Sequence, residues 1–125
     1  MIEVNQLVSL FDSIVHLLQA AADRYSRSSA TYKRALLAVY VASSETKSYV
    51  MGLKQRKSPD REREAKLSRL WSEAAVELRH IDRDLADKCL LHSDFLAEAM
   101  QWSDSEIDQA RNSIKDVFEQ ARQLL

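Results

Sequence analysis

The sequence predicts an all-α fold: an antiparallel up-down-up-down four-helix bundle with long helices, formed by a single domain over residues 1–125. Glycine and proline occur only once each, whereas sheet proteins with many hairpins need such residues at their turns. Apolar residues recur at alternating spacings of three and four along four segments, which is typical of helices that bury one stripe. Hydrophobic residues make up 46% and charged residues 30% of the chain, as in globular domains.

The first two segments each carry one apolar stripe. The stripe of the first consists of Val4, Leu7, Phe11, Ile14, Leu18, Ala21 and Tyr25. The second helix is expected from about Ser29 to Gln55, with a stripe of Tyr32, Leu36, Val39, Ser43, Thr46, Val50 and Leu53. Because Ser43 and Thr46 are small, we expect a polar seam there at which a neighbouring helix approaches closely.

A third stripe predicts the longest helix. Its members are Leu67, Leu70, Trp71, Ala74, Leu78, Ile81, Leu85, Cys89, His92, Leu96, Ala99 and Met100. The helix is expected to begin near Pro59, because proline suits a first helical turn, where its missing N–H is not needed. Ser58 is then the expected N-cap.

The length of this third helix conflicts with a four-helix bundle. At 1.5 Å per residue, an unbroken helix over 59–101 spans ~64 Å, whereas the first helix spans ~36 Å. One solution is a break near 91–94, with Ser93 capping a short fifth helix near 93–101. The other is an overhanging helix whose exposed stripe, Leu96 included, contacts a second copy in a homodimer. The break is the preferred interpretation.

The fourth segment has the clearest start signal. Ser103 followed by Glu106 forms a capping box, and Asp104 adds favourable charge at the helix N-terminus. Its stripe consists of Ile107, Ala110, Ile114, Val117, Ala121 and Leu124. A seven-residue repeat in all segments predicts helix crossing angles of ~20°.

The sequence predicts a cytoplasmic protein that does not cross or bind a membrane. The N-terminal residues lack the basic start and apolar core of a signal peptide. The longest apolar run, 35–42, has eight residues, against the ~20 that span a bilayer. Cys89 is the only cysteine and lies on the third stripe, so we expect a buried, unreactive thiol rather than a nucleophile.

Glu77 and His80 match the Glu-x-x-His spacing with which bundle helices bind metal. Di-iron bundles need this motif twice, together with single glutamates from the other helices, and a second copy is missing. We therefore interpret the two residues as a solvated pair and predict no metal and no cofactor.

Two histidines invite comparison with known helical sites. His16 occupies the histidine position of the His-x-x-Lys-Gly core of histidine phosphotransfer domains, but Gln19 and Ala20 replace the lysine and glycine. Helical ribonuclease domains of toxins place four to six residues between an arginine and a histidine, whereas eight separate Arg83 from His92. We therefore expect an exposed His16 and a partly buried, hydrogen-bonded His92 in the core.

Charge is divided between the two halves of the chain. Residues 1–70 carry a net charge of +5 and residues 71–125 a net charge of −6. Much of the basic excess gathers at the turn between the second and third helices. The second of two interpretations of this turn is a nucleic-acid contact through Lys54, Arg56, Lys57 and Arg61. The preferred interpretation is a solvated turn whose charges pair within the third helix.

With no catalytic motif identified, the leading prediction is a non-enzymatic protein–protein interaction module: an adaptor, an antitoxin or immunity-type protein, or a small subunit of a larger complex. Trp102 and Leu96 are the predicted partner contacts, and the partner is another protein or a second copy of the chain. The alternative is a nucleic-acid-contacting subunit that uses the basic tip. The third hypothesis is a helical-bundle enzyme that uses His16, His80 or His92.

Overall fold

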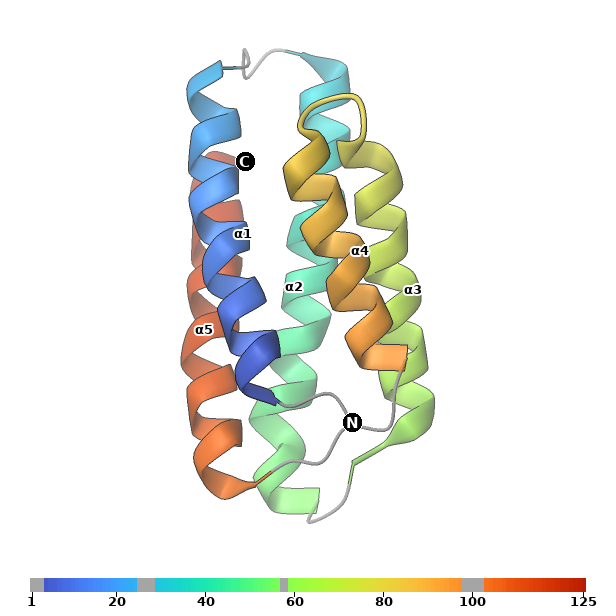
Figure 1. Ribbon diagram of the computed structural model, residues 1–125, viewed down its shortest axis with the longest axis vertical. Helices are drawn as coiled ribbons and strands as arrows, with labels where there is room; N and C mark the ends of the chain where they lie inside the picture. Colours follow the sequence, from blue (N-terminus) through green and yellow to red (C-terminus); the bar gives the residue numbers. More distant parts are fainter. Residues whose placement is uncertain (1–3, 25–28, 57–58, 98–102) are drawn as a thin grey trace.

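The structure, a computed structural model, describes residues 4–24, 29–56, 59–97 and 103–125, and within these ranges the side chains at positions 4, 5, 7, 54, 56 and 95 are not described. The described residues form five helices: α1 (Val4–Arg24), α2 (Ala30–Arg56), α3 (Arg61–Leu78), α4 (Arg83–Ala97) and α5 (Asp104–Leu124). None of these residues lies in a strand. The predicted all-α bundle is confirmed (Figure 1).

The helices pack as a closed ring around one core. Helix α1 contacts α4 and α5, α2 contacts α3 and α5, and α3 contacts α4. Thus α5 packs against both α1 and α2, which are consecutive in sequence but do not contact each other through their described residues. A hydrogen bond joins Gln19 and Gln120 near the ends of α1 and α5, so these two helices run parallel. Arg24, at the end of α1, pairs with Asp82 before α4, so those two run antiparallel.

The predicted third helix is two helices, and the predicted position of the break is wrong. Helix α3 ends at Leu78 and α4 begins at Arg83, whereas the chain is helical through 91–94. Ser93 is therefore not a cap. Its hydroxyl donates to the carbonyl of Ser68 at 2.7 Å, which joins α4 to α3. Folding back at the turn shortens the segment to fit the bundle, since α3 spans ~27 Å and α4 ~23 Å at 1.5 Å per residue.

Local hydrogen bonds explain why the chain turns after Leu78. The backbone N–H groups of Ile81 and Asp82 both donate to the Leu78 carbonyl, at 2.9 Å each. The Asp82 carboxylate then accepts from the backbone N–H of Leu85 at 3.0 Å, which makes Asp82 the cap of α4. Ile81 stays buried in the turn, so the apolar stripe continues although the helix does not.

The other caps partly match the sequence. Helix α3 starts two residues later than expected, because Asp60 is its N-cap and accepts from Arg63 N–H at 3.1 Å; Ser58 lies outside the described residues. Ser103 caps α5 and accepts from Glu106 N–H at 3.2 Å, as predicted. The Ser103 hydroxyl also donates to the Glu106 carboxylate at 2.7 Å.

The predicted polar seam of α2 lies in the core. Ser43 and Thr46 are fully buried. The Trp71 indole N–H donates to the Thr46 hydroxyl at 2.9 Å, and Thr46 donates to the Ala42 carbonyl at 2.8 Å. This relay satisfies the polar atom of the largest core side chain and links α3 to α2. Within the described part of the chain, no helix is long and apolar enough to cross a membrane.

Candidate docking groove

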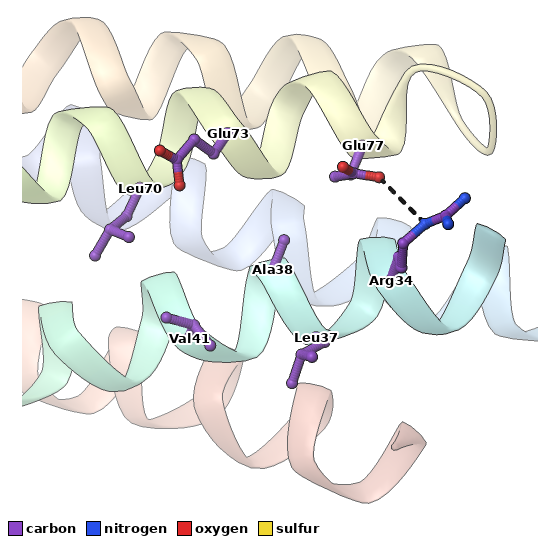
Figure 2. A pocket seen from close by; sticks show the side chains of 7 residues that line it. All are labelled: Arg34, Leu37, Ala38, Val41, Leu70, Glu73 and Glu77. Carbon is purple, nitrogen blue, oxygen red and sulfur yellow. Dashed lines mark ion pairs between the residues drawn. The ribbon is translucent and has the colours of Figure 1, made fainter. Parts of the chain in front are cut away.

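The surface between α2 and α3 is hollowed into an open groove of about 400 Å³ (Figure 2). Its lining residues are Arg34, Leu37, Ala38 and Val41 from α2, and Leu70, Glu73 and Glu77 from α3. In each helix these positions follow helical spacing, so each helix offers one continuous stripe. The two stripes form the two walls of the groove.

The apolar part of the groove is open to solvent. Leu37 is 51% and Val41 40% exposed, and both belong to the small set of large hydrophobic side chains that face solvent in the described residues. Leu36 and Val39, their neighbours in sequence, are in the core. Helix α2 therefore carries apolar side chains on two faces, one packed inward and one facing solvent.

Two carboxylates on α3 give the groove its charge. Glu77 pairs with Arg34 across the groove, with 3.9 Å between Oε2 and Nε (Figure 2). Both side chains are well exposed, so this pair contributes little to stability. Glu73 is exposed and forms no ion pair within the described ranges. The groove therefore has a negative charge beside its apolar wall that the described residues do not compensate.

This groove was not predicted, although the sequence contains a signal for it. The apolar run 35–42 is too short to span a membrane, but it is long enough to predict apolar side chains on the solvent-facing side of a helix. A surface helix needs about three apolar residues per two turns to bury one face. Eight apolar residues in succession must place some side chains on the opposite face, and Leu37 and Val41 are those residues.

The structure gives Glu77 and His80 different surroundings. Glu77 contacts Arg34, and His80 is exposed beyond the end of α3. No group of three His, Cys, Asp or Glu side chains able to hold a metal ion occurs among the residues described. His80 instead lines a separate hollow at the turn between α3 and α4.

The structure separates the other histidines. His16 is exposed on α1, as predicted, and lines a hollow against α4 that includes Asp84 and Asp87. Arg83 lies at the exposed start of α4, whereas His92 is buried nine residues later, ~13.5 Å along the helix axis. Arg83 and His92 are therefore not brought into one site.

His92 is buried as expected, but the described residues do not supply the expected hydrogen bond. Its ring lies between Phe11 and Trp71, with centroid distances of 4.3 Å to each. Neither ring nitrogen has a hydrogen-bond partner among the described residues. Burial lowers the pKa of His92 to about 3, so the imidazole is neutral at pH 7. Burial also raises the pKa of the Cys89 thiol, so that it stays protonated and unreactive.

The predicted basic tip lies where α2 meets α3. Arg61 pairs with the buried carboxylate of Glu64, with 2.7 Å between Nη1 and Oε1, which partly neutralises Arg61. The side chains of Lys54 and Arg56, and all of Lys57, lie outside what the structure describes. The nucleic-acid contact stays a prediction.

The two predicted partner contacts have different outcomes. Trp102 lies outside the described residues. Leu96 is 2% exposed and packs in the core of its own chain. Because α4 folds back on α3, the chain's own helices cover the apolar stripe that an overhanging helix would have exposed. The reason for placing Leu96 at a homodimer contact is therefore removed.

Comparisons of the chain with known protein families, curated proteins and solved structures find no match. The function of the groove is therefore inferred from its geometry and chemistry.

Proposed function

We propose that this protein is a non-enzymatic interaction module whose α2–α3 groove binds an amphipathic helix of a partner protein. The partner helix carries apolar side chains on one face and a lysine or arginine beside them. The observation that carries the proposal is the exposure of Leu37 and Val41 next to the exposed carboxylate of Glu73.

The dimensions of the groove favour a helix as the occupant. The α2 wall runs from Arg34 to Val41, which is ~10.5 Å along the axis, or two helical turns. A third helix laid between α2 and α3 would place residues at spacings of three and four against this wall, as in other helix-in-groove complexes. Ala38 lies on the side of α2 that faces α3, and its small side chain leaves room there for a partner side chain (Figure 2).

Charge sets which helix would fit. Burying the exposed areas of Leu37 and Val41 supplies attraction but little selectivity. A cation placed against Glu73 adds selectivity, since an acidic partner side chain at that position would be repelled. The exposed Arg34–Glu77 pair bounds one end and can rearrange at low energetic cost.

A displayed library of helical peptides, each about four turns long, tests this chemistry directly. We expect the protein to enrich peptides with apolar residues at spacings of three and four and a lysine or arginine beside them. Val41→Glu should abolish the enrichment, and Glu73→Lys should switch it toward acidic peptides. Leu90→Glu is the matched control, because Leu90 is 48% exposed on α4 and lies away from the groove.

The Glu73→Lys charge reversal distinguishes specific binding in the groove from nonspecific hydrophobic association. Enrichment that is unchanged by Val41→Glu, or a charge preference that Glu73→Lys does not alter, would contradict the proposal. Light scattering supplies the other decisive measurement. If the protein self-associates and Val41→Glu makes it monomeric, the groove is occupied by a second copy of the chain rather than by a different protein.

A further inference from the structure

A second hollow, of about 510 Å³, lies at the turn between α3 and α4. Its lining residues are Arg79, His80, Arg83, Ala86 and Asp87. The tight turn over residues 79–82 brings two arginines and a histidine to the same hollow. Three side chains that donate hydrogen bonds thus face one space.

The arginines of this hollow are not held in ion pairs by the described residues. Arg79 and Arg83 are both exposed, and neither forms an ion pair within the described part of the chain. Asp82, the carboxylate between them in sequence, is already engaged. It pairs with Arg24 of α1 and accepts the backbone N–H of Leu85. The hollow therefore holds two arginine charges against the single carboxylate of Asp87, an excess of positive charge that an anion would stabilise.

The start of α4 forms the floor of this hollow. Arg83 is the first residue of a 15-residue helix, whose N-terminus is already capped by the Asp82 carboxylate, so the two arginines supply the positive charge of the hollow. Ala86, one turn further along, is small and buried, so the floor of the hollow carries no bulky side chain. The arginine forks are therefore the largest groups around it.

We propose that this hollow binds the phosphate group of a small molecule. A phosphate dianion has the oxygen geometry that guanidinium forks bind in bidentate fashion. Arg79 and Arg83 would each contact the phosphate, and His80 would donate a further hydrogen bond. The hollow has the size of ordinary small-molecule sites.

Nearby carboxylates favour a small ligand over a nucleic acid. Asp87 lines the hollow, and exposed Asp84 follows Arg83 in the first turn of α4. A single phosphate can sit between the arginines, whereas a phosphate backbone that continues along α4 meets these negative charges. Asp87 also lines the hollow between α1 and α4, which gives the rest of an organic phosphate a neighbouring surface.

Titration with inorganic phosphate, followed by amide chemical shifts in NMR, tests the proposal. We expect saturable shifts confined to residues 79–87. Arg79→Gln and Arg83→Gln should each weaken binding about tenfold, which matches the loss of a charge-assisted contact. Asp87→Asn should tighten binding severalfold. Arg122→Gln, at an exposed arginine on α5, is the matched control and should change nothing.

Several outcomes would overturn this site. Shifts that do not saturate, or that occur equally around all basic side chains, would show unspecific anion binding. Acetate binding as tightly as phosphate would remove the preference for a dianion. A single-stranded oligonucleotide that binds through Arg79 and Arg83 more tightly than phosphate would identify a nucleic-acid surface instead. Val41→Glu should leave phosphate binding intact, which separates this site from the α2–α3 groove.

Discussion

Two ionisable side chains of the core, Glu64 and His92, have completely different surroundings. Glu64 is 1% exposed at the α2–α3 end of the bundle, where its carboxylate accepts from the Tyr49 hydroxyl at 2.5 Å and from Arg61 at 2.7 Å. His92 is 0% exposed between α1 and α3, with the aromatic rings of Phe11 and Trp71 against it. At Glu64, the buried carboxylate is satisfied by hydrogen bonds, one of which joins α2 to α3. At His92, the two ring nitrogens are buried without hydrogen bonds from the described residues.

This difference determines whether a substitution stabilises or destabilises the protein. Removing one member of a satisfied buried network leaves its partners unpaired, which is strongly destabilising. An unsatisfied buried group already carries its desolvation penalty of about 1–3 kcal/mol, so an apolar replacement relieves it. The same type of change should therefore destabilise the protein at Glu64 and stabilise it at His92.

The largest effect is expected from Glu64→Ala, with a loss of about 3 kcal/mol in the free energy of unfolding. The substitution removes both hydrogen bonds and leaves the buried Tyr49 hydroxyl without its carboxylate partner. Urea unfolding measures the loss. Glu62→Ala is the control, since Glu62 is exposed in the same turn and should change stability by less than about 0.5 kcal/mol. Equal losses for the two variants would contradict the role of the buried network.

The next largest effect is a dependence of stability on pH that comes from His92. Its pKa is about 3 in the folded state, against the ordinary histidine value of 6.5 that applies to the unfolded chain. Below pH 6.5 the unfolded chain therefore binds more protons than the folded protein. The contribution of neutral His92 to the free energy of unfolding is thus fully present above pH 6.5 and is lost as pH falls toward 3. Between pH 7 and pH 5 the loss should be about 2 kcal/mol.

Comparing the protein with its His92→Leu variant isolates this effect from the carboxylates. Both proteins share all acidic side chains, so the difference between their unfolding free energies at each pH reports His92 alone. A difference that stays constant from pH 7 to pH 5 would show that the buried imidazole does not resist protonation.

A smaller effect is expected at constant pH 7, where His92→Leu should stabilise the protein by about 1 kcal/mol. Leucine removes the unsatisfied nitrogens while filling most of the space between Phe11 and Trp71. His92→Gln is the matched control, because it keeps polar atoms in the same place and should give no gain. A loss of more than about 1 kcal/mol in His92→Leu would show that the imidazole has a stabilising partner.

Sequence periodicity predicts which residues are buried better than it predicts where helices end. The stripe Leu78, Ile81, Leu85 is continuous in sequence, and all three side chains are buried. The helix nevertheless breaks between them, without glycine or proline. Asp82 is the sequence signal for this break, because aspartate is a good N-cap residue. An aspartate within a regular stripe also fits an exposed helical position, however, so the signal is ambiguous.

Polar partners are harder to predict, because they come from other helices. Periodicity placed His92 in the core but could not show that the rings of Phe11 and Trp71 would lie against it. Similarly, the sequence pattern around Glu64 suggests a surface charge, since its burial depends on Tyr49, fifteen residues earlier. The α2–α3 groove was missed for the same reason, as its two walls belong to different helices.

The smallest effect is expected at the edge of the Glu64 network, where the Arg63 guanidinium lies over the Tyr49 ring at 5.3 Å from its centroid. Arg63 is only partly buried, and cation–π contacts at such sites contribute about 0.5–1 kcal/mol. Arg63→Ala should therefore cost about 0.5 kcal/mol, and Arg63→Lys less, because lysine keeps the cation. A double-mutant cycle with Glu64→Ala decides whether the contact depends on the network. If the Glu64–Tyr49 hydrogen bond holds the ring in place, the cost of Arg63→Ala disappears in the Glu64→Ala background. An unchanged cost would show that Tyr49 is positioned by core packing alone, and the stabilising role given to Glu64 would then be limited to its own two hydrogen bonds.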